Sequence, residues 1–164
     1  MSKTEKNLAD AFAGESQANR KYLAFAQKAE SEGYSQAAKL FRAAAHGETI
    51  HAHSHLRALG GIGNTADNLK EAIGGETFEF ESMYPPMIAD ADAEGNKAAA
   101  RSFTYANDVE KIHARLYKEA LDNLDSLAPA DYYVCSVCGY IAVDDVPESC
   151  PVCNAKAKAF SKID

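Results

Sequence analysis

The sequence predicts an all-α bundle of four helices, followed by a small C-terminal domain held together by four cysteines. Three observations carry this prediction. Residues 1–128 contain no proline apart from Pro85 and Pro86, and glycine-rich breaks divide them into four long segments. All four cysteines fall between Cys135 and Cys153, in two C-x-x-C pairs. Long helices with short connections typically pack as a bundle, and two such cysteine pairs typically bind a metal.

Glycines and helix-capping residues set the expected bounds of each element. Gly33, Gly60 and Gly95 suit helix ends, where a left-handed backbone is common, and Ser35 and Asn96 suit helix starts. We therefore expect four helices, over 4–32, 35–59, 65–94 and 96–127. Because proline lacks an N–H, the adjacent prolines of the third helix predict a kink or an irregular turn. The expected domains are a helical bundle at 1–128, a linker at 129–131 and a metal domain at 132–164.

The composition narrows the possible functions. Of the 164 residues, 46% are hydrophobic, which is enough for a packed core, and the formal net charge is −7. An acidic chain without a basic cluster is a poor partner for nucleic acid. No apolar run approaches the roughly 20 residues of a membrane helix, and the polar first residues do not form a secretory signal. Paired cysteines in such a chain favour a reducing compartment, so we expect the cytoplasm.

Each expected helix places one glutamate within its apolar stripe. Helix residues three, four and seven positions apart share a face, and apolar or aromatic neighbours surround one glutamate per helix: Glu15, Glu48, Glu76 and Glu110. Buried carboxylates require protons, cations or metal, and lysine and arginine are scarce on these faces. His51 and His113 stand three residues after the second and fourth glutamates. One Glu plus one Glu-x-x-His, present twice, predicts a di-metal site.

Three further residues lie close to these glutamates in the helical pattern. Glu79 comes one turn after Glu76, whereas Ala18 stands at the equivalent place in the first helix. We interpret Glu79 as a fifth carboxylate that exchanges at one metal; the alternative is a solvated glutamate. Tyr22 and Tyr84 lie about two turns after the glutamates of the first and third helices. They are either hydrogen-bond donors to the ligands or ordinary core tyrosines.

The cysteine pairs form a second expected metal site. Cys135 and Cys138 make the first pair, and Cys150 and Cys153 make the second. A tetrahedral set of four thiolates accepts either zinc or iron. Zinc would indicate a structural or binding module, and iron would indicate a one-electron carrier. The segment is too short for a core of its own, so its folding should depend on the metal.

Taken together, these motifs resemble the rubrerythrin family, in which a ferritin-like di-iron domain precedes a rubredoxin-like domain. The resemblance covers essentially the whole chain and rests on Glu15 with Tyr22, both Glu-x-x-His pairs, the run from Gly75 to Pro86, and the CxxCGY and CPxC motifs. It implies that one iron moves between Glu79 and His51 on redox change. It also implies a full ligand set: Glu15, Glu48, His51, Glu76, Glu79, Glu110 and His113 for two irons, and Cys135, Cys138, Cys150 and Cys153 for another iron.

The resemblance further implies a peroxidase that reduces hydrogen peroxide to water in oxidative-stress defence, with Glu79, His51, Tyr22 and Tyr84 at its centre. Electrons would come from NAD(P)H through a rubredoxin or an NAD(P)H-dependent reductase. A separate carrier is needed because the chain has no glycine-rich motif that would bind NAD(P)H itself. The alternatives are an iron-oxidising, iron-handling protein and a non-enzymatic zinc module. The cysteine domain argues against iron handling, since oxidising Fe(II) releases electrons and does not consume them.

We also expect a homodimer or a higher homo-oligomer in which electrons pass between subunits. In a helix over 96–127, His113 lies roughly 20 Å from the C-terminal end. A cysteine domain hanging from that end would therefore be far from the di-iron site of its own chain. A head-to-tail dimer, which the resemblance favours, would instead place it against the metals of a partner.

Overall fold

The computed structural model describes all residues, 1–164, and groups them into two compact units, Met1–Gly63 and Asn64–Asp164. The boundary between the units coincides with the glycine-rich break after the second helix. The first unit is a helical hairpin, and the second unit holds the remaining helices and a small sheet. The structure thus contains the long helices and the four-cysteine segment that the sequence predicts. The domain bounds 1–128, 129–131 and 132–164 remain a prediction.

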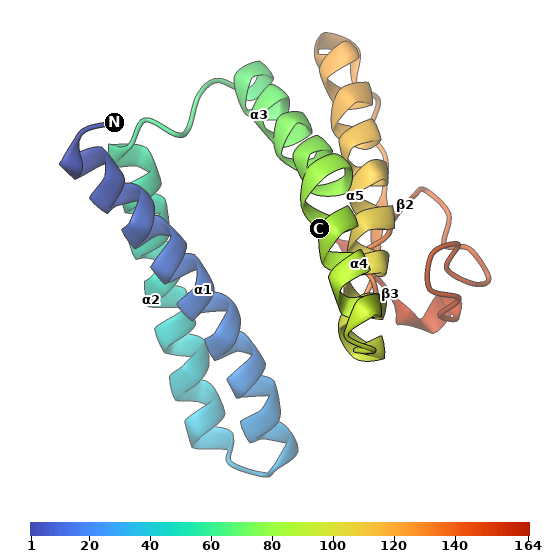
Figure 1. The fold of residues 1–164 in the computed structure, drawn as a ribbon, viewed down its shortest axis with the longest axis horizontal. Helices are drawn as coiled ribbons and strands as arrows, with labels where there is room; N and C mark the ends of the chain where they lie inside the picture. The colour runs from blue at the N-terminus through green and yellow to red at the C-terminus, as the bar shows by residue number, and fades with distance from the viewer. The chain divides into compact units, whose positions relative to one another are not determined.

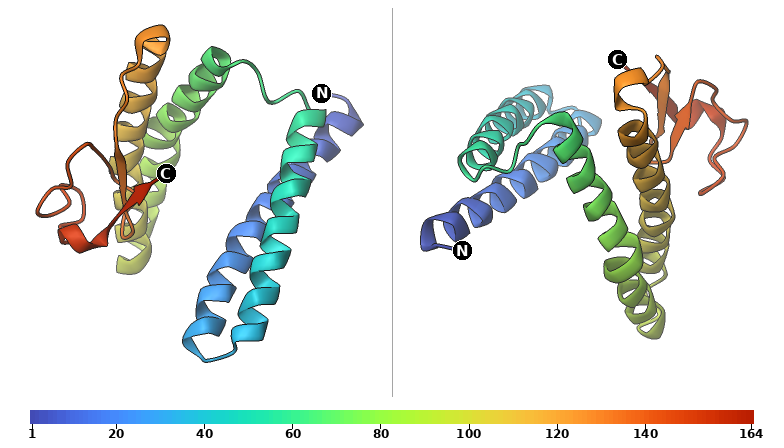
Figure 2. Two further views of the ribbon diagram at one scale, coloured as in Figure 1. Left: turned by 180° about the vertical axis from the view of Figure 1, so that it is seen from behind. Right: turned by 90° about the horizontal axis from the view of Figure 1, so that it is seen from above.

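The first unit consists of α1 (Lys3–Ser31) and α2 (Ser35–Ala58), which run side by side in all views (Figures 1 and 2). Ser2 and Glu5 form a reciprocal capping box at the start of α1. Gly33 adopts a φ of 83° in the turn between the helices. Small residues let the two helices approach closely, and the buried positions are all alanines: Ala26, Ala29, Ala38, Ala45 and Ala52.

The third expected helix is divided in the structure. It comprises α3 (Thr65–Phe78), a π-helical turn η1 (Glu79–Met83) and α4 (Tyr84–Ala93). The expected irregularity near Pro85 and Pro86 is therefore present, and its form is a widened turn just before the prolines. These prolines stand at the start of α4, where a helix does not need their N–H groups.

The second unit continues with α5 (Lys97–Asp122), which packs against α3, η1 and α4. Asn96 caps its start by accepting a hydrogen bond from the Ala99 N–H. A short 3-10 turn, η2 (Leu124–Ser126), follows the helix. The expected helix over 96–127 therefore ends several residues early, and the chain turns back from there.

The C-terminal segment forms a three-stranded antiparallel sheet in the order β2-β1-β3. The strands are β1 (Tyr132–Cys135), β2 (Ile141–Val143) and β3 (Phe160–Ile163), with a 3-10 turn η3 (Ala157–Ala159) before β3. The sequence pattern does not predict this sheet, because its strands are only three or four residues long and too short for a clear alternation.

This C-terminal domain folds back against α5 of its own chain (Figure 2). The Gly139 carbonyl lies 3.2 Å from the His113 Nε2 atom. Val109 is only 1% exposed, and a Cβ atom built on Gly139 would lie 3.8 Å from the Val109 Cγ1 atom. The expectation that the domain hangs from the end of the helix, far from His113, is therefore wrong. The chain from Asn123 to Asp131 is long enough to return the domain to the middle of α5.

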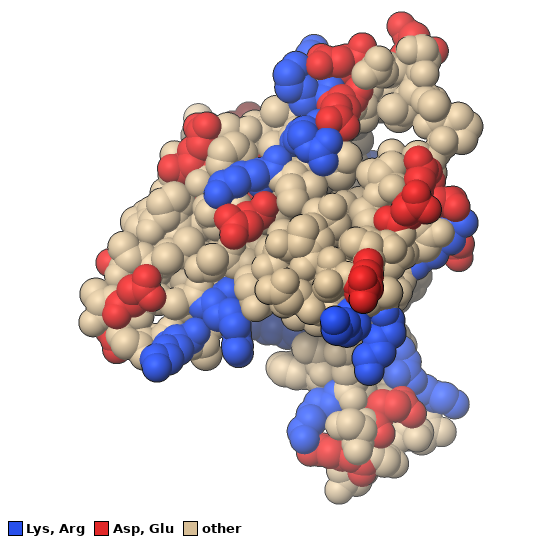
Figure 3. All heavy atoms as spheres, turned by 90° about the vertical axis from the view of Figure 1, so that its right-hand side faces the viewer, with Lys and Arg blue, Asp and Glu red and all other residues tan.

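The surface carries charges of both signs. On the face drawn in Figure 3, lysine and arginine side chains lie among aspartate and glutamate side chains. That the protein does not bind nucleic acid stays a prediction from its net charge of −7. None of the helices combines the length and the hydrophobicity needed to cross a membrane.

Candidate metal centres

The first unit brings together Glu15 from α1 with Glu48 and His51 from α2. Their ligand atoms all lie within 4.8 Å of one another. The His51 Nδ1 atom is 2.9 Å from the Glu48 Oε2 atom and 3.8 Å from the Glu15 Oε1 atom. The i,i+3 spacing on α2 places the imidazole and the carboxylate on one face, as the sequence predicts. Two carboxylates and an imidazole nitrogen so close together could hold a divalent metal.

The second unit brings together Glu76 from α3 with Glu110 and His113 from α5, again with all ligand atoms within 4.8 Å. The His113 Nδ1 atom is 2.8 Å from the Glu110 Oε2 atom and 3.6 Å from the Glu76 Oε1 atom. Burial, and then the nearby Glu110 carboxylate, raise the pKa of Glu76, although His113 partly opposes this. Negative charge concentrated in a partly buried place is the setting in which a cation binds strongly.

The outer nitrogen of His113 supports metal binding by this second triad. Metal-bound histidines almost always donate their other ring N–H to a carbonyl or carboxylate, which fixes the tautomer. His113 meets this requirement, because its Nδ1 atom faces the two carboxylates and its Nε2 atom is 3.2 Å from the Gly139 carbonyl oxygen. With Nδ1 as the ligand atom, the Nε2–H donates to Gly139.

Glu79 lies beside the second triad but outside the cluster of ligand atoms. It is the first residue of the π-helical turn, one turn after Glu76. Burial, and then the Glu76 carboxylate, raise the pKa of Glu79, so the two carboxylates feel each other's charge. The first triad has no such additional carboxylate, since Ala18 stands at the equivalent position. The difference between the two triads that the sequence predicts, an extra carboxylate beside the second one only, is therefore present in the folded chain.

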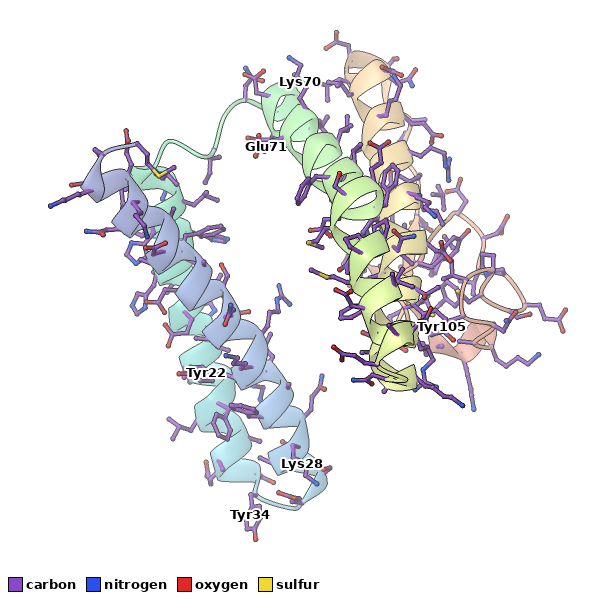
Figure 4. The ribbon with its side chains drawn as sticks, viewed as in Figure 1. Tyr22, Lys28, Tyr34, Lys70, Glu71 and Tyr105 are labelled. Carbon is purple, nitrogen blue, oxygen red and sulfur yellow. The ribbon has the colours of Figure 1, made fainter.

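The two tyrosines differ in their surroundings. Burial, followed by the charges of Glu79, Glu110 and Glu76, raises the pKa of Tyr84, so this hydroxyl lies in the field of the second triad and its extra carboxylate. Tyr22 packs against Phe25 and Phe41, with ring centroids 6.4 and 6.3 Å away. Figure 4 shows Tyr22 within the α1–α2 hairpin, with Tyr34 at the turn that closes it.

The four cysteines form a compact cluster in the C-terminal domain. Cys135 and Cys153 have sulfur atoms 3.7 Å apart, and those of Cys138 and Cys150 are 3.5 Å apart. A tetrahedral ion with metal–sulfur bonds of about 2.3 Å requires sulfurs about 3.8 Å apart. All four residues are free thiols without a disulfide. The cluster therefore fits the tetrahedral four-cysteine metal site that the sequence predicts.

The two cysteine pairs are held by matching backbone turns. The Cys135 N–H donates to the Tyr140 carbonyl, and the Cys150 N–H donates in the same way to the Ala155 carbonyl. The residue after each pair has a left-handed backbone, with φ of 86° at Gly139 and 59° at Asn154. Asparagine tolerates this conformation better than most residues, so the lack of a second glycine leaves the turn intact. Tyr140 and Phe160 pack edge to face beside the cluster.

Two residues around the second triad were not identified from the sequence. Gly139 lies within the CxxCGY motif, but its contact with His113 depends on tertiary packing. Asn107 lies on α5 one turn before Glu110 and is the buried polar residue of the chain, 9% exposed. Asn107 stands four residues after Phe103, on the apolar face of the helix, and a polar residue on such a face is a sequence signal for a buried hydrogen bond.

Comparison with known proteins agrees with this geometry. Residues 6–121 match the family model for rubrerythrin, and residues 133–161 match the model for the rubredoxin-like domain of rubrerythrin. Rubrerythrin-2 of Clostridium acetobutylicum is 36% identical, and the alignment covers 93% of this chain and 92% of the relative. Nigerythrin of Nitratidesulfovibrio vulgaris is 35% identical, and the alignment covers 96% of this chain and 85% of nigerythrin.

Solved structures give the same result. The structure of fully reduced, all-ferrous nigerythrin matches with a TM-score of 0.61 and 33% identity, covering 99% of this chain and 88% of that one. The glutamate and histidine triads and the four-cysteine cluster supply the residues for a di-iron centre and a rubredoxin-like iron site. The fold class is accordingly a ferritin-like helical domain with a small rubredoxin-like domain. The chain belongs to the rubrerythrin family.

Proposed function

We propose that this protein is a non-haem di-iron peroxidase of oxidative-stress defence that reduces hydrogen peroxide to water. The reaction consumes two electrons and two protons for each peroxide, breaks the O–O bond and yields two waters. One observation carries the proposal: the His113 imidazole joins the second triad to the cysteine domain, through Nδ1 on one side and the Gly139 carbonyl on the other. This arrangement suits an enzyme whose carboxylate site needs repeated delivery of electrons.

The proposed ligands are the residues of the two triads, one additional carboxylate and the four cysteines. When bound, the iron pair supplies two electrons at once, and the four-cysteine iron accepts and passes on single electrons. The two triads contain the same three residue types, which supports their joint use in one di-iron centre. The proposed ligand set is Glu15, Glu48, His51, Glu76, Glu79, Glu110 and His113 for the iron pair, and Cys135, Cys138, Cys150 and Cys153 for the single iron.

Tyr84, Glu79, His51 and Tyr22 are proposed to act on the bound peroxide or on the metals. A tyrosine hydroxyl is protonated at neutral pH, and burial and the nearby carboxylates raise the pKa of Tyr84 further, so it can donate a hydrogen bond to an oxygen near the carboxylates. Glu79 and His51 are the proposed exchanging ligands. Their positions support this, because Glu79 lies outside the tight cluster and the His51 side chain is 59% exposed.

Electrons are proposed to enter through the cysteine domain from an external donor, a rubredoxin or an NAD(P)H-dependent reductase in the cytoplasm. The domain contacts α5 of its own chain at Val109 and His113, which favours transfer within one chain. Cys138 immediately precedes Gly139, so the path from this cysteine to His113 runs through the Cys138–Gly139 peptide bond, the Gly139 carbonyl and one hydrogen bond. The proposed homodimer is therefore not needed to bring these two groups together.

The test is peroxide consumption by iron-loaded protein, supplied with NADH, a rubredoxin reductase and rubredoxin. We expect rapid NADH oxidation that depends on peroxide and falls to background in Cys138→Ser, which damages only the cysteine site. Valid comparison requires the variant to retain the same iron at the carboxylate site. Formation of a ferric mineral from added Fe(II), with no turnover of peroxide, would instead support the iron-handling alternative.

A further inference from the structure

The feature that leads to a further inference is a buried side chain next to the π-helical turn. Asn107 is 9% exposed, and no other polar or charged residue of the chain is buried. An amide in such a place costs free energy unless both its N–H₂ group and its oxygen find partners. Asn107 is neither a proposed metal ligand nor a helix cap, so its burial needs another explanation.

The turn η1 leaves the backbone carbonyls of Phe80 and Glu81 without their usual donors, and Glu81 is exposed whereas Phe80 is partly buried. The Tyr84 N–H donates to the Glu79 carbonyl, five residues back, as in a π-helix. It is therefore not the ordinary α-helical donor to Phe80. The next residue, Pro85, would be the π-helical donor to Phe80 but has no N–H. The Phe80 carbonyl thus depends on a donor from outside its own helix.

Asn107 supplies that donor. In the amide orientation that satisfies both of its polar groups, its nitrogen donates to the Phe80 carbonyl oxygen at 3.0 Å. Its oxygen then accepts from the Lys111 Nζ atom at 3.2 Å, and Lys111 is held in turn by Asp108 at 3.1 Å. One side chain of α5 therefore completes the hydrogen bonding of the turn that follows Glu79.

We propose that Asn107 is a positioning residue that holds the π-helical turn, and with it Glu79, in register with the ligands of α5. Asn107 lies one turn before Glu110, so it fixes the spacing between the turn and the helix that carries Glu110 and His113. Its effect on turnover rests on the proposed di-iron function. Its effect on the turn itself does not, because the hydrogen bond joins two groups of the protein.

The first experiment measures amide hydrogen exchange in the metal-free full-length protein. The Tyr84 N–H reports on the turn, since it donates to the Glu79 carbonyl. Asn107→Leu roughly keeps the volume and removes the donor, so exchange at Tyr84 should become roughly tenfold faster, the effect of leaving a partly buried carbonyl without its partner. Asn107→Asp, which has no N–H to donate when ionised, provides a second variant should the leucine variant not fold.

A compensating substitution makes the test specific. Pro85→Ala restores an N–H that is five residues after Phe80 and four after Glu81. In the π-helical register that the Tyr84 N–H already follows, it donates to the Phe80 carbonyl. In that background Asn107→Leu should change Tyr84 exchange much less than in the parent protein. Asn19→Leu is the matched control, because Asn19 also donates between helices, to the Ala45 carbonyl and the Thr49 hydroxyl, but in the other hairpin. It should leave Tyr84 exchange unchanged.

Unchanged exchange in the Asn107 variants, or an increase that Pro85→Ala does not reduce, overturns the proposal. Peroxide turnover then provides the functional measurement. Where the parent protein is active, Asn107→Leu should lose at least several-fold in rate and regain it with Pro85→Ala; undiminished turnover would mean that Asn107 does not position Glu79. Where the parent is inactive, the proposed function fails, and hydrogen exchange alone decides whether Asn107 holds the turn.

Discussion

The two triads contain the same three residue types but have different surroundings. In the second unit, the His113 side chain is 19% exposed and contacts the Gly139 carbonyl, and Glu79 and Tyr84 lie nearby. In the first unit, the His51 side chain is 59% exposed, and Ala18 occupies the place equivalent to Glu79. The two units therefore have similar helical patterns but different triads. The second unit has a hydrogen-bonded imidazole, His113, and an extra carboxylate, Glu79, whereas the first unit has a more exposed imidazole, His51.

This division of properties matters for a site whose ligands are proposed to exchange. A ligand can leave a metal only if no other contact holds it in place. The proposed exchanging ligands are His51, the more exposed imidazole, and Glu79, the carboxylate outside the tight cluster, so each unit contributes one of them. The fixed partner, His113, is the residue that faces the cysteine domain. Electron entry and ligand exchange are thus assigned to different histidines.

The strongest test of this comparison mixes two inactive chains. One carries Cys135→Ala and the other Glu110→Ala, and each alone should be nearly inactive with an external electron donor. Because His113 and the cysteine domain meet within one chain, mixed assemblies should stay inactive. Activity is measured on mixed assemblies purified through two different tags, with doubly tagged parent protein as the control. Recovery of activity would show that electrons cross between chains, as the sequence alone suggested.

The next effect concerns the extra carboxylate. Glu79→Ala should keep the iron bound by the two triads but lose most of the peroxidase rate, roughly tenfold or more, since the exchanging ligand is absent. Glu81→Ala is the matched control: it lies in the same π-helical turn, but its side chain is exposed. Iron content per chain and peroxide-dependent NADH oxidation are measured for both. Equal rates in the two variants would remove Glu79 from the site.

Much of the fold and of the candidate metal sites could be predicted from the sequence, because local rules determine them. Helix bounds followed from capping residues and glycines, and both triads followed from i,i+3 spacing, because these are local rules. The π-helical turn depends on hydrogen-bond register around Pro85, and its partner Asn107 comes from another helix. The docking of Gly139 on His113 likewise depends on the path of the chain after α5. Contacts between distant segments are not encoded in a local pattern.

A smaller effect separates the two histidines in protein that carries metal in the four-cysteine site but none at the carboxylates. His113→Ala removes the hydrogen bond to Gly139 and should loosen the cysteine domain by about 1 kcal/mol. Cleavage of the segment between α5 and β1 by a nonspecific protease should then become several-fold faster. His51→Ala should leave this cleavage unchanged, since His51 belongs to the other unit. Equal cleavage rates in the two variants would mean that the His113 contact does not hold the domain.

The smallest expected effect is a pH dependence from the second triad. Burial and Glu110 raise the pKa of Glu76 above its ordinary value of 4.5, so the folded metal-free protein holds this proton more tightly than the unfolded chain does. The contribution of Glu76 to stability is therefore favourable at low pH and is lost as the pH rises through the folded pKa. Glu76→Gln, which stays neutral, should be the more stable protein above that range and should gain nothing below it. Denaturant unfolding between pH 4 and 8 measures the difference, with Glu71→Gln, an exposed glutamate on the same helix (Figure 4), as the control. A gain in stability that does not change with pH would show that Glu76 titrates alike in the folded and unfolded chains.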